Sequence, residues 1–348
     1  MNPSNATPLL NVSDLTKHFP LQRGVFEKMA FRKGRFRWIS QTVHAVNGVN
    51  LDIHRGDTLA LVGESGCGKS TLAKTIIGLY APTSGQVIYN GQDIGRLAGA
   101  ARKPYQKKIQ IIFQDPFSSL NPRKKVLDII AQPIDVHGLA KGAARSERVA
   151  TLLEKVGLSA DYAQRYPHQF SGGQRQRIGI ARALASEPDL IIADEPISAL
   201  DVSIQAQILN LMMDLQEALG LTYLFVSHDL SVVRHISNRV AVMYLGFIVE
   251  YGDTEALFED PKHPYTQMLF SAIPSLDTLE FQDQFGLKGE VPTPIQLPCG
   301  CVFHPRCPKV MDRCRVDHPM LREIETGRWA ACHLYDHQQR SNGRPMYR

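Results

Sequence analysis

The stretch GESGCGKS, residues 63–70, decides the fold of this chain. It fits the phosphate-loop pattern G-x-x-x-x-G-K-[ST], in which glycines let backbone N–H groups turn inward around a phosphate. The apolar run Thr58–Val62 before it predicts a strand, and Lys69–Tyr80 after it predicts a helix. Because strand, loop and helix follow in this order, the stretch predicts a nucleotide site rather than an ordinary glycine-rich turn.

Two side chains of the loop carry the chemistry of such a site. Lys69 can reach the β and γ phosphates, and the Ser70 hydroxyl can ligate Mg²⁺. The positive N-terminal end of the following helix favours the same anion. The residues expected to bind the nucleotide here are Gly63, Glu64, Ser65, Gly66, Cys67, Gly68, Lys69, Ser70 and Thr71.

Length and composition allow a large domain with a smaller one. The chain has 348 residues, 43% of them hydrophobic, and a net charge of +5. No apolar run reaches the roughly 18 residues that a membrane helix needs. Residues 1–8 are polar and lack the apolar core of a signal peptide, so we expect the protein to stay in the cytoplasm. The mild charge permits an anionic membrane surface or a nucleic acid nearby but requires neither.

Strand and helix patterns alternate through most of the chain. Strands are expected at Leu10–Phe19, Val43–Ile53, Gln86–Asn90, Ile109–Phe113, Leu190–Asp194 and Thr222–Ser227, helices at Val126–Ile130, Arg145–Val156, Gln174–Ala185 and Ser203–Leu219, and a hairpin at Val240–Tyr251 turning at Gly246. This alternation predicts an α/β fold with a largely parallel, covered sheet. Beyond Asp260 prolines become frequent and periodicity weakens, so we divide the chain into domains 1–255 and 256–348.

Polar residues follow three of the expected strands. Asp194 ends an apolar strand, so its carboxylate emerges at the sheet edge where α/β proteins place ligands, which suits Mg²⁺. Glu195 follows and is the candidate base for the attacking water. His228 can contact the γ-phosphate, and the neutral amide of Gln114 can ligate Mg²⁺ and sense the nucleotide. On its own, an acidic pair at a strand end is more often solvated, and a histidine there is more often structural. Because these residues occur beside a phosphate loop, we favour a catalytic role for them.

Together these motifs resemble the ATP-binding cassette family over residues 9–255. The matching features, in the family's order, are the phosphate loop, Gln114 in FQDP (113–116), SGGQ (171–174), Asp194-Glu195, SALD (198–201) and His228. The resemblance implies a P-loop ABC nucleotide-binding domain: a RecA-like core, an antiparallel β subdomain and a helical subdomain at about 96–181.

The resemblance also implies a site shared between two subunits. Two cassettes would pair head to tail, and Ser171, Gly172, Gly173 and Gln174 of one would cap the γ-phosphate held by the other. The stretch 171–174 is equally consistent with an ordinary N-capped helix start. Asp201 would lie at the dimer seam. Phe19, at the end of the first strand, matches the position of the family's adenine-stacking aromatic.

A narrower likeness covers nearly the whole chain. FQDPFSSLNPR (113–123), RYPHQF (165–170), SALDVSIQ (198–205), HPYT (263–266) and the cysteine-rich end look like dipeptide and oligopeptide importer ATPase subunits. That branch implies ATP and Mg²⁺ as cofactors. It implies as partners a second homologous ATPase subunit in a heterodimer, two membrane-spanning permease subunits and a separate solute-binding protein, and no nucleic acid. It also places the ATPase peripherally at the cytoplasmic face of the inner (plasma) membrane.

Other functions remain open beside this one. Nickel and other small-solute importers share much of the pattern. A soluble cassette protein acting on ribosomes or DNA would usually carry two cassettes or a long coiled-coil insertion, and neither is present. A cassette without activity would be expected to lack Lys69 or Glu195, and both are present.

Five of the six cysteines crowd into the C-terminal region. The four at Cys301, Cys307, Cys314 and Cys332 match the pattern of the importer branch, and four thiolates can hold a [4Fe–4S] cluster. The wide gaps are unlike paired C-x-x-C zinc sites, although His304 and His333 keep zinc open, and free thiols are the third reading. Cys299 is interpreted as a spare thiol, and the alternative that it competes as a ligand stays open. A cluster here would staple a small domain rather than catalyse.

Basic and aromatic residues alternate in the segment 23–41. Such a mixture suits an anionic membrane interface or single-stranded nucleic acid, and is as often a solvated loop. We rank the solvated loop first and the membrane second.

Overall fold

The computed structural model describes residues 7–21, 29–32, 35–38, 41–271 and 292–338. The chain forms two compact units, each described here by itself. The first comprises residues 1–10, 52–61 and 89–239, and the second comprises 11–51, 62–88 and 240–348. Because these units group segments that are not contiguous in sequence, they do not test the boundary at residue 255, which stays a prediction.

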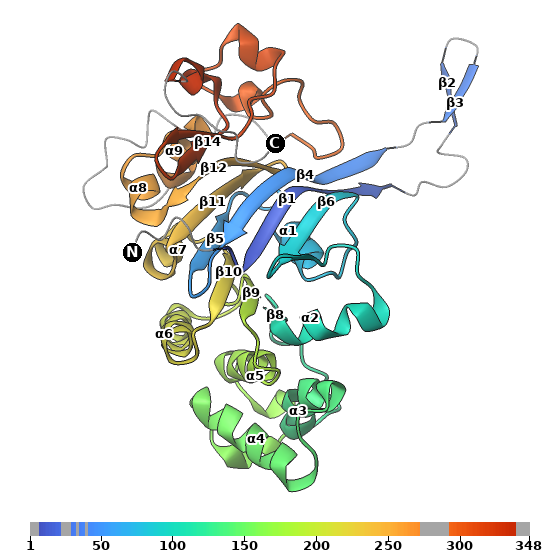
Figure 1. The fold of residues 1–348 in the computed structure, drawn as a ribbon, viewed down its shortest axis with the longest axis vertical. Helices are drawn as coiled ribbons and strands as arrows, with labels where there is room; N and C mark the ends of the chain where they lie inside the picture. The colour runs from blue at the N-terminus through green and yellow to red at the C-terminus, as the bar shows by residue number, and fades with distance from the viewer. Residues whose placement is uncertain (1–6, 22–28, 33–34, 39–40, 272–291, 339–348) are drawn as a thin grey trace. The chain divides into compact units, whose positions relative to one another are not determined.

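The first unit contains a parallel sheet. Its strands β5 (Thr58–Val62), β10 (Thr222–Val226), β9 (Leu190–Asp194) and β8 (Ile109–Ile112) are neighbours in that order (Figure 1). Each adjacent pair runs parallel. Every residue of β5, β9 and β10 is buried, as in a sheet covered on both faces. The predicted parallel sheet is therefore confirmed.

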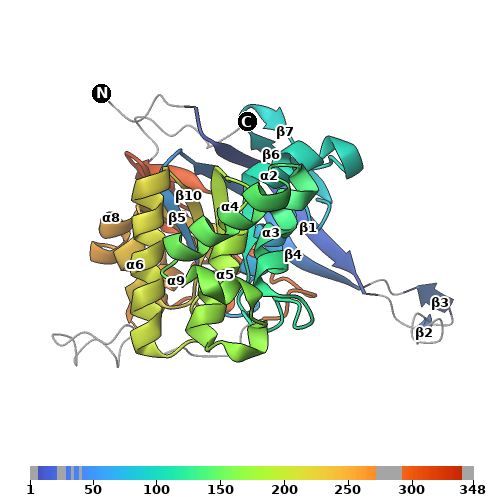
Figure 2. The same ribbon diagram turned by 90° about the horizontal axis from the view of Figure 1, so that it is seen from below.

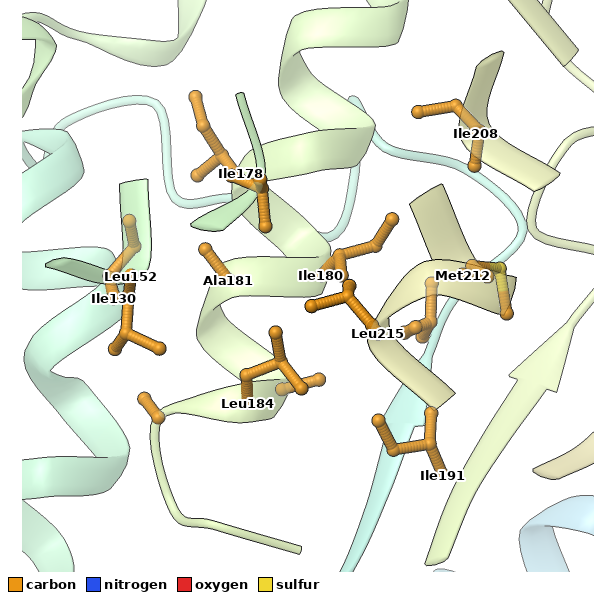
Figure 3. Close-up of a cluster of buried hydrophobic side chains, with 14 of the residues drawn as sticks. Ile130, Leu152, Ile178, Ile180, Ala181, Leu184, Ile191, Ile208, Met212 and Leu215 are labelled. Carbon is orange, nitrogen blue, oxygen red and sulfur yellow. The ribbon is translucent and has the colours of Figure 1, made fainter. Parts of the chain in front are cut away.

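Helices cover this sheet and build a helical region beside it. They are α2 (Lys103–Lys108), α3 (Val126–His137), α4 (Gly142–Lys155), α5 (Gly172–Leu184), α6 (Val202–Leu219) and α7 (Leu230–Ile236), with a two-residue strand β7 (Gln92–Asp93) before them. Helices α3, α4 and α5 pack against one another, and α5 also contacts α6 (Figure 2). One apolar cluster joins these elements, including Ile130, Leu152, Ile178, Leu184, Ile191 and Met212 (Figure 3).

Besides a short two-stranded sheet described below, the second unit contains strands of two larger sheets. In one, β4 (Thr42–Ile53), β1 (Leu10–Pro20) and β6 (Ser84–Tyr89) are neighbours in that order. In the other the order is β13 (Arg322–Glu325), β14 (Arg328–Ala330), β12 (Phe247–Asp253) and β11 (Arg239–Tyr244). The antiparallel pairing of β14 with β12 attaches the C-terminal region to the predicted hairpin. The helices of this unit are α1 (Lys69–Ile76), α8 (Thr254–Glu259) and α9 (Pro264–Ser271).

Three local predictions differ from the structure. The helix expected to run to Tyr80 ends at Ile76, because Gly78 takes a φ of +83° that a right-handed helix cannot continue. The helices α2, α7, α8 and α9 were not predicted. In the segment 23–41, Met29–Arg32 (β2) and Arg35–Trp38 (β3) pair as an antiparallel hairpin rather than a loop. The remainder of that segment, except Gln41, lies outside the described residues, as do residues 1–6 of the predicted N-terminal stretch.

Candidate nucleotide site

The phosphate loop joins β5 to α1 and needs glycine at two points. Gly63 has a φ of +150°, and a Cβ there would lie 2.2 Å from the carbonyl oxygen of Met243. At Gly68, with a φ of +113°, a Cβ would lie 2.1 Å from the carbonyl oxygen of Ala45. Because backbone on β11 and β4 presses so closely on the loop, any larger residue would force it open.

The ammonium group of Lys69 is held over the loop by the loop's own backbone. Its Nζ donates to the carbonyl oxygens of Gly63 at 2.7 Å and Glu64 at 3.0 Å, and the side chain is buried. Beside it, burial raises the pKa of the Cys67 thiol, so Cys67 stays protonated and unreactive at neutral pH. An ammonium so placed offers a charge-assisted donor to a phosphate oxygen.

The remaining loop residues lead into the N-terminus of α1. Gly68 is the residue before the helix, and Ser70 and Thr71 lie in its first turn. The first N–H groups of a helix have no partners within it, and the helix dipole places partial positive charge there. This geometry suits an anion, and the nucleotide-binding roles of these residues stay predictions.

In the first unit, Gln114, Glu195 and His228 come together. The amide Nε2 of Gln114 donates to Oε2 of Glu195 at 2.8 Å. His228 Nδ1 lies 3.3 Å from the other oxygen, Oε1. Glu195 itself has a φ of +49°, a left-handed conformation that costs energy for a residue with a side chain. The three predicted catalytic side chains are thus fixed in one group around one carboxylate.

Asp194 ends β9, as predicted, directly before this group. It is buried and pairs in register with Val226, the last residue of β10. The backbone N–H of Glu195 continues the ladder by donating to the Val226 carbonyl at 3.0 Å. The acidic pair therefore emerges where two parallel strands end, which is the ligand-binding edge of such sheets.

The SGGQ stretch forms the start of α5. Ser171 is its N-cap: its Oγ accepts from the backbone N–H of Gln174, and the Gln174 side chain accepts from the backbone N–H of Ser171, a capping box. A Cβ on Gly173 would lie 2.5 Å from Cγ2 of Ile204, so glycine lets α5 approach α6 closely. The exposed Asp201 precedes α6, and its carboxylate makes no capping bond.

Arginines of α5 tie this helix to the segment that follows Gln114. Arg182 Nη1 donates to the Ser119 carbonyl at 2.6 Å, and the Arg175 guanidinium lies 4.0 Å from the centre of the Phe117 ring. These two contacts connect α5 to the segment behind Gln114. Sequence reasoning missed both arginines, because nothing in their spacing indicates partners more than fifty positions away.

Phe19 lies in the second unit beside a second aromatic that sequence reasoning missed. The rings of Phe19 and Tyr80 meet edge to face at 5.2 Å, and Lys17 Nζ lies 4.7 Å from the Phe19 centroid. Tyr80 is the more exposed residue of this pair, with 36% of its surface accessible to solvent. A planar base can stack on either ring, so Tyr80 joins Phe19 as a candidate adenine contact.

The C-terminal thiols lie near one another. Burial raises the pKa of Cys301 to about 11 and of Cys332 to about 12, and repulsion between neighbouring thiolates adds to both shifts. Within the ranges that the structure describes, however, no group of three or more His, Cys, Asp or Glu side chains is placed to hold a metal ion. The arrangement gives no support to the iron–sulfur cluster expected from the sequence, nor to the zinc alternative.

The phosphate-loop motif in its strand–loop–helix setting and an acidic pair at the end of a parallel strand are each typical of P-loop nucleotide hydrolases. Comparison with known protein families identifies the family within this class. The family described as "ABC transporter" matches residues 46–198, and "Oligopeptide/dipeptide transporter, C-terminal region" matches 249–314. The chain belongs to the ABC transporter ATPases, as the sequence motifs predicted, and carries the C-terminal region of the oligopeptide and dipeptide transporters.

Relatives match along nearly their whole length. The oligopeptide transport ATP-binding protein AppF of Bacillus subtilis is 50% identical, covering 96% of this chain and 100% of AppF. The dipeptide transport ATP-binding protein DppF of Haemophilus influenzae is 48% identical, covering 95% of this chain and 98% of DppF. A solved structure, the dimeric post-hydrolysis state of the ATP-binding cassette MJ0796 bound to ADP and Pi, aligns with a TM-score of 0.60 at 29% identity, covering 70% of this chain and 98% of that one.

Among the helices of the described part of the chain, none is both long enough and apolar enough to cross a bilayer.

Proposed function

We propose that this ATPase is the energy subunit of an importer for dipeptides or oligopeptides. The observation that carries the proposal is the Gln114–Glu195–His228 group, which gives the cassette a held base for hydrolysis. The full-length likeness to peptide transport ATP-binding proteins supports the substrate class. The C-terminal match to oligopeptide and dipeptide transporters supports it independently.

The residues divide the work of hydrolysis between them. Lys69 and N–H groups of the segment 63–71, other than that of Glu64, which bonds Tyr265, bind the ATP phosphates. Ser70, Gln114 and Asp194 hold Mg²⁺ directly or through water. Glu195 accepts the proton of the attacking water, and His228 contacts the γ-phosphate. Gln114 senses whether the γ-phosphate is bound. Phe19 or Tyr80 stacks on adenine.

The second half of each site comes from another subunit in this proposal. The α5 start, with Ser171, Gly172, Gly173 and Gln174, caps the γ-phosphate bound by a homologous ATPase, and Asp201 lies at the seam. The dimeric state of the similar cassette MJ0796 supports such pairing. Two permease subunits in the membrane and a separate solute-binding protein complete the assembly. This places the ATPase peripherally, at the cytoplasmic face of the inner membrane.

For the C-terminal region, which we take as residues 256–348, we propose a [4Fe–4S] cluster ligated by Cys301, Cys307, Cys314 and Cys332. The proposal rests on the match of these four positions to the importer pattern and on the chemistry of four thiols, of which Cys301 and Cys314 are buried while Cys299 is exposed. The iron atoms of a cubane are themselves held apart, so its four ligands need not converge on one point as they do for a single ion. The cluster would staple this region and takes no part in hydrolysis.

Transport in cells tests the proposed substrate. The natural host lacking this chain should lose uptake of labelled dipeptides or oligopeptides and keep uptake of nickel. The wild-type chain should restore peptide uptake, whereas Lys69→Ala should not, because the phosphates lose their ammonium partner. Loss of nickel uptake with peptide uptake intact would replace the peptide assignment by the nickel alternative.

A further inference from the structure

The second residue of the phosphate loop is held by side chains from the C-terminal region. The backbone N–H of Glu64 donates to the hydroxyl oxygen of Tyr265 at 2.9 Å. Its carboxylate accepts two hydrogen bonds from Arg306, at 2.8 Å from Nη1 and 3.0 Å from Nη2. All three residues belong to the second unit. The loop is therefore held by hydrogen bonds to both the backbone and the side chain of Glu64.

The ion pair with Glu64 is shielded from water. The Arg306 side chain is 3% exposed and the Glu64 side chain 18%. The two parallel bonds form the bidentate geometry that makes guanidinium–carboxylate pairs strong. Arg306 also donates to the hydroxyl oxygen of Tyr244 at 3.4 Å. Removing one member of such a pair leaves the other charge buried without compensation.

A rigid aromatic group supports these contacts. The rings of Tyr244, Tyr265 and Phe303 are fully buried, with centroids 4.6 to 5.5 Å apart. Burial raises the pKa of Tyr265, so its phenol stays neutral. Arg306 itself ends the short turn His304–Arg306, between Cys301 and Cys307. The cysteine-bearing segment thus presents the guanidinium to the loop.

One peptide unit links Tyr265 to the ammonium of Lys69. The N–H of the Gly63–Glu64 peptide bonds Tyr265, and its C=O accepts the 2.7 Å bond from Lys69. Because a peptide is planar, fixing the N–H direction also fixes the carbonyl that holds Lys69. Tyr265 therefore orients the group that must meet the phosphates.

The charge of Glu64 has a consequence of its own. ATP carries several negative charges, and a bare carboxylate within the loop that binds it would repel the phosphates. The buried guanidinium of Arg306 cancels that charge at a distance of 2.8 Å. The neutralisation comes from outside the loop, from the part of the chain that follows the cassette.

We propose that Tyr265 and Arg306 are positioning residues of the ATP site, through which the C-terminal region sets the affinity for ATP. Tyr265 aligns the peptide that holds Lys69, and Arg306 neutralises Glu64. The proposal extends the ATPase activity and does not depend on which solute is imported.

The test is equilibrium binding of a fluorescent ATP analogue with Mg²⁺ to the full-length chain, with kcat and KM from the assembled transporter. Arg306→Met should raise Kd and KM at least about tenfold, or about 1.4 kcal/mol, with kcat nearly unchanged. Tyr265→Phe, which keeps the ring, should raise Kd about threefold. The double variant Arg306→Met with Glu64→Gln should return Kd to within about threefold of wild type, because the repelling carboxylate is gone.

Arg328 supplies a matched control. It lies in the same region, its side chain is 11% exposed, and it pairs with Glu250 and Glu325, not with the loop. Arg328→Met should leave Kd for the analogue unchanged. The proposal is overturned if Arg328→Met weakens binding as much as Arg306→Met, or if the double variant binds no better than the single one. Either result would assign Arg306 only to the stability of its own region. Failure of peptide uptake would leave this test unaffected.

Discussion

Gln114 Nε2 donates a 2.8 Å hydrogen bond to Oε2 of Glu195, although 81 positions separate the two residues. The sheet register brings them together. Ile112 of β8 lies opposite Ala193 of β9 in a parallel pair, and Gln114 and Glu195 each follow two residues later, just beyond the strand ends. The proposed sensor and the proposed base are thus placed by the same ladder.

Replacing Glu195 by glutamine tests its role as the base. The amide cannot accept the water's proton, so ATP turnover by the assembled transporter should fall about 10² to 10⁴-fold. ATP binding should persist, and the variant should accumulate as an ATP-bound dimer with its partner subunit in size-exclusion chromatography. Glu217→Gln, on an exposed face of α6, is the control. Turnover near the wild-type rate would remove Glu195 from the mechanism.

Gly173→Ala tests the close approach of α5 to α6. The new methyl group would lie 2.5 Å from Cγ2 of Ile204, which should displace the proposed phosphate-capping turn and lower ATP turnover about tenfold. Ile204→Ala removes the opposing atom and should restore most of the rate. Gly179→Ala, in the same helix with open space around its Cβ, should stay fully active. Failure of the second substitution to rescue would mean that Gly173 serves the nucleotide directly rather than helix packing.

His263 predicts acid sensitivity of folding. It is buried, accepts a 3.0 Å bond at Nδ1 from the Tyr265 N–H, and burial lowers its pKa to about 3. The unfolded chain protonates this histidine near pH 6.5 while the folded chain does not. The free energy of unfolding should therefore decrease as pH falls from 6.5 toward 3, by up to about 1.4 kcal/mol per pH unit.

Denaturant unfolding of wild type and His263→Asn at pH 6.5, 6.0, 5.5 and 5.0 measures this contribution. Asparagine keeps an acceptor for Tyr265 but does not titrate, so the variant's stability should fall less steeply in this window. The exposed His235→Asn is the control and should retain the wild-type slope. Parallel slopes for wild type and His263→Asn would show that His263 is protonated in the folded protein.

The cluster proposal predicts the colour and metal content of the protein. Purified under argon, the full-length chain should be brown, with about four iron and four sulfide per chain. Cys332→Ser should lose most of the iron, and Cys299→Ser should keep it, because the Cys299 side chain is exposed and is not one of the proposed ligands. A colourless protein, with or without zinc, would refute the cluster.

Much of the fold follows from local patterns. The strands Thr58–Val62 and Leu190–Asp194 have the bounds that their apolar runs predict, because a strand buried on both faces needs an unbroken run of such residues. The hairpin turn at Gly246 was also predicted, and its φ of +85° is one that glycine adopts without strain. The short helices α2, α7, α8 and α9, none longer than eight residues, were not predicted.

The sequence by itself determined the chemistry of the nucleotide site, because the phosphate loop and the acidic pair each lie within a few consecutive residues. Only the tertiary structure showed what holds them. The left-handed backbone of Glu195, the approach of α5 to α6 at Gly173, and the grip of Arg306 on Glu64 all depend on partners distant in the chain. Such contacts arise from packing of separate elements, and no spacing within one segment encodes them.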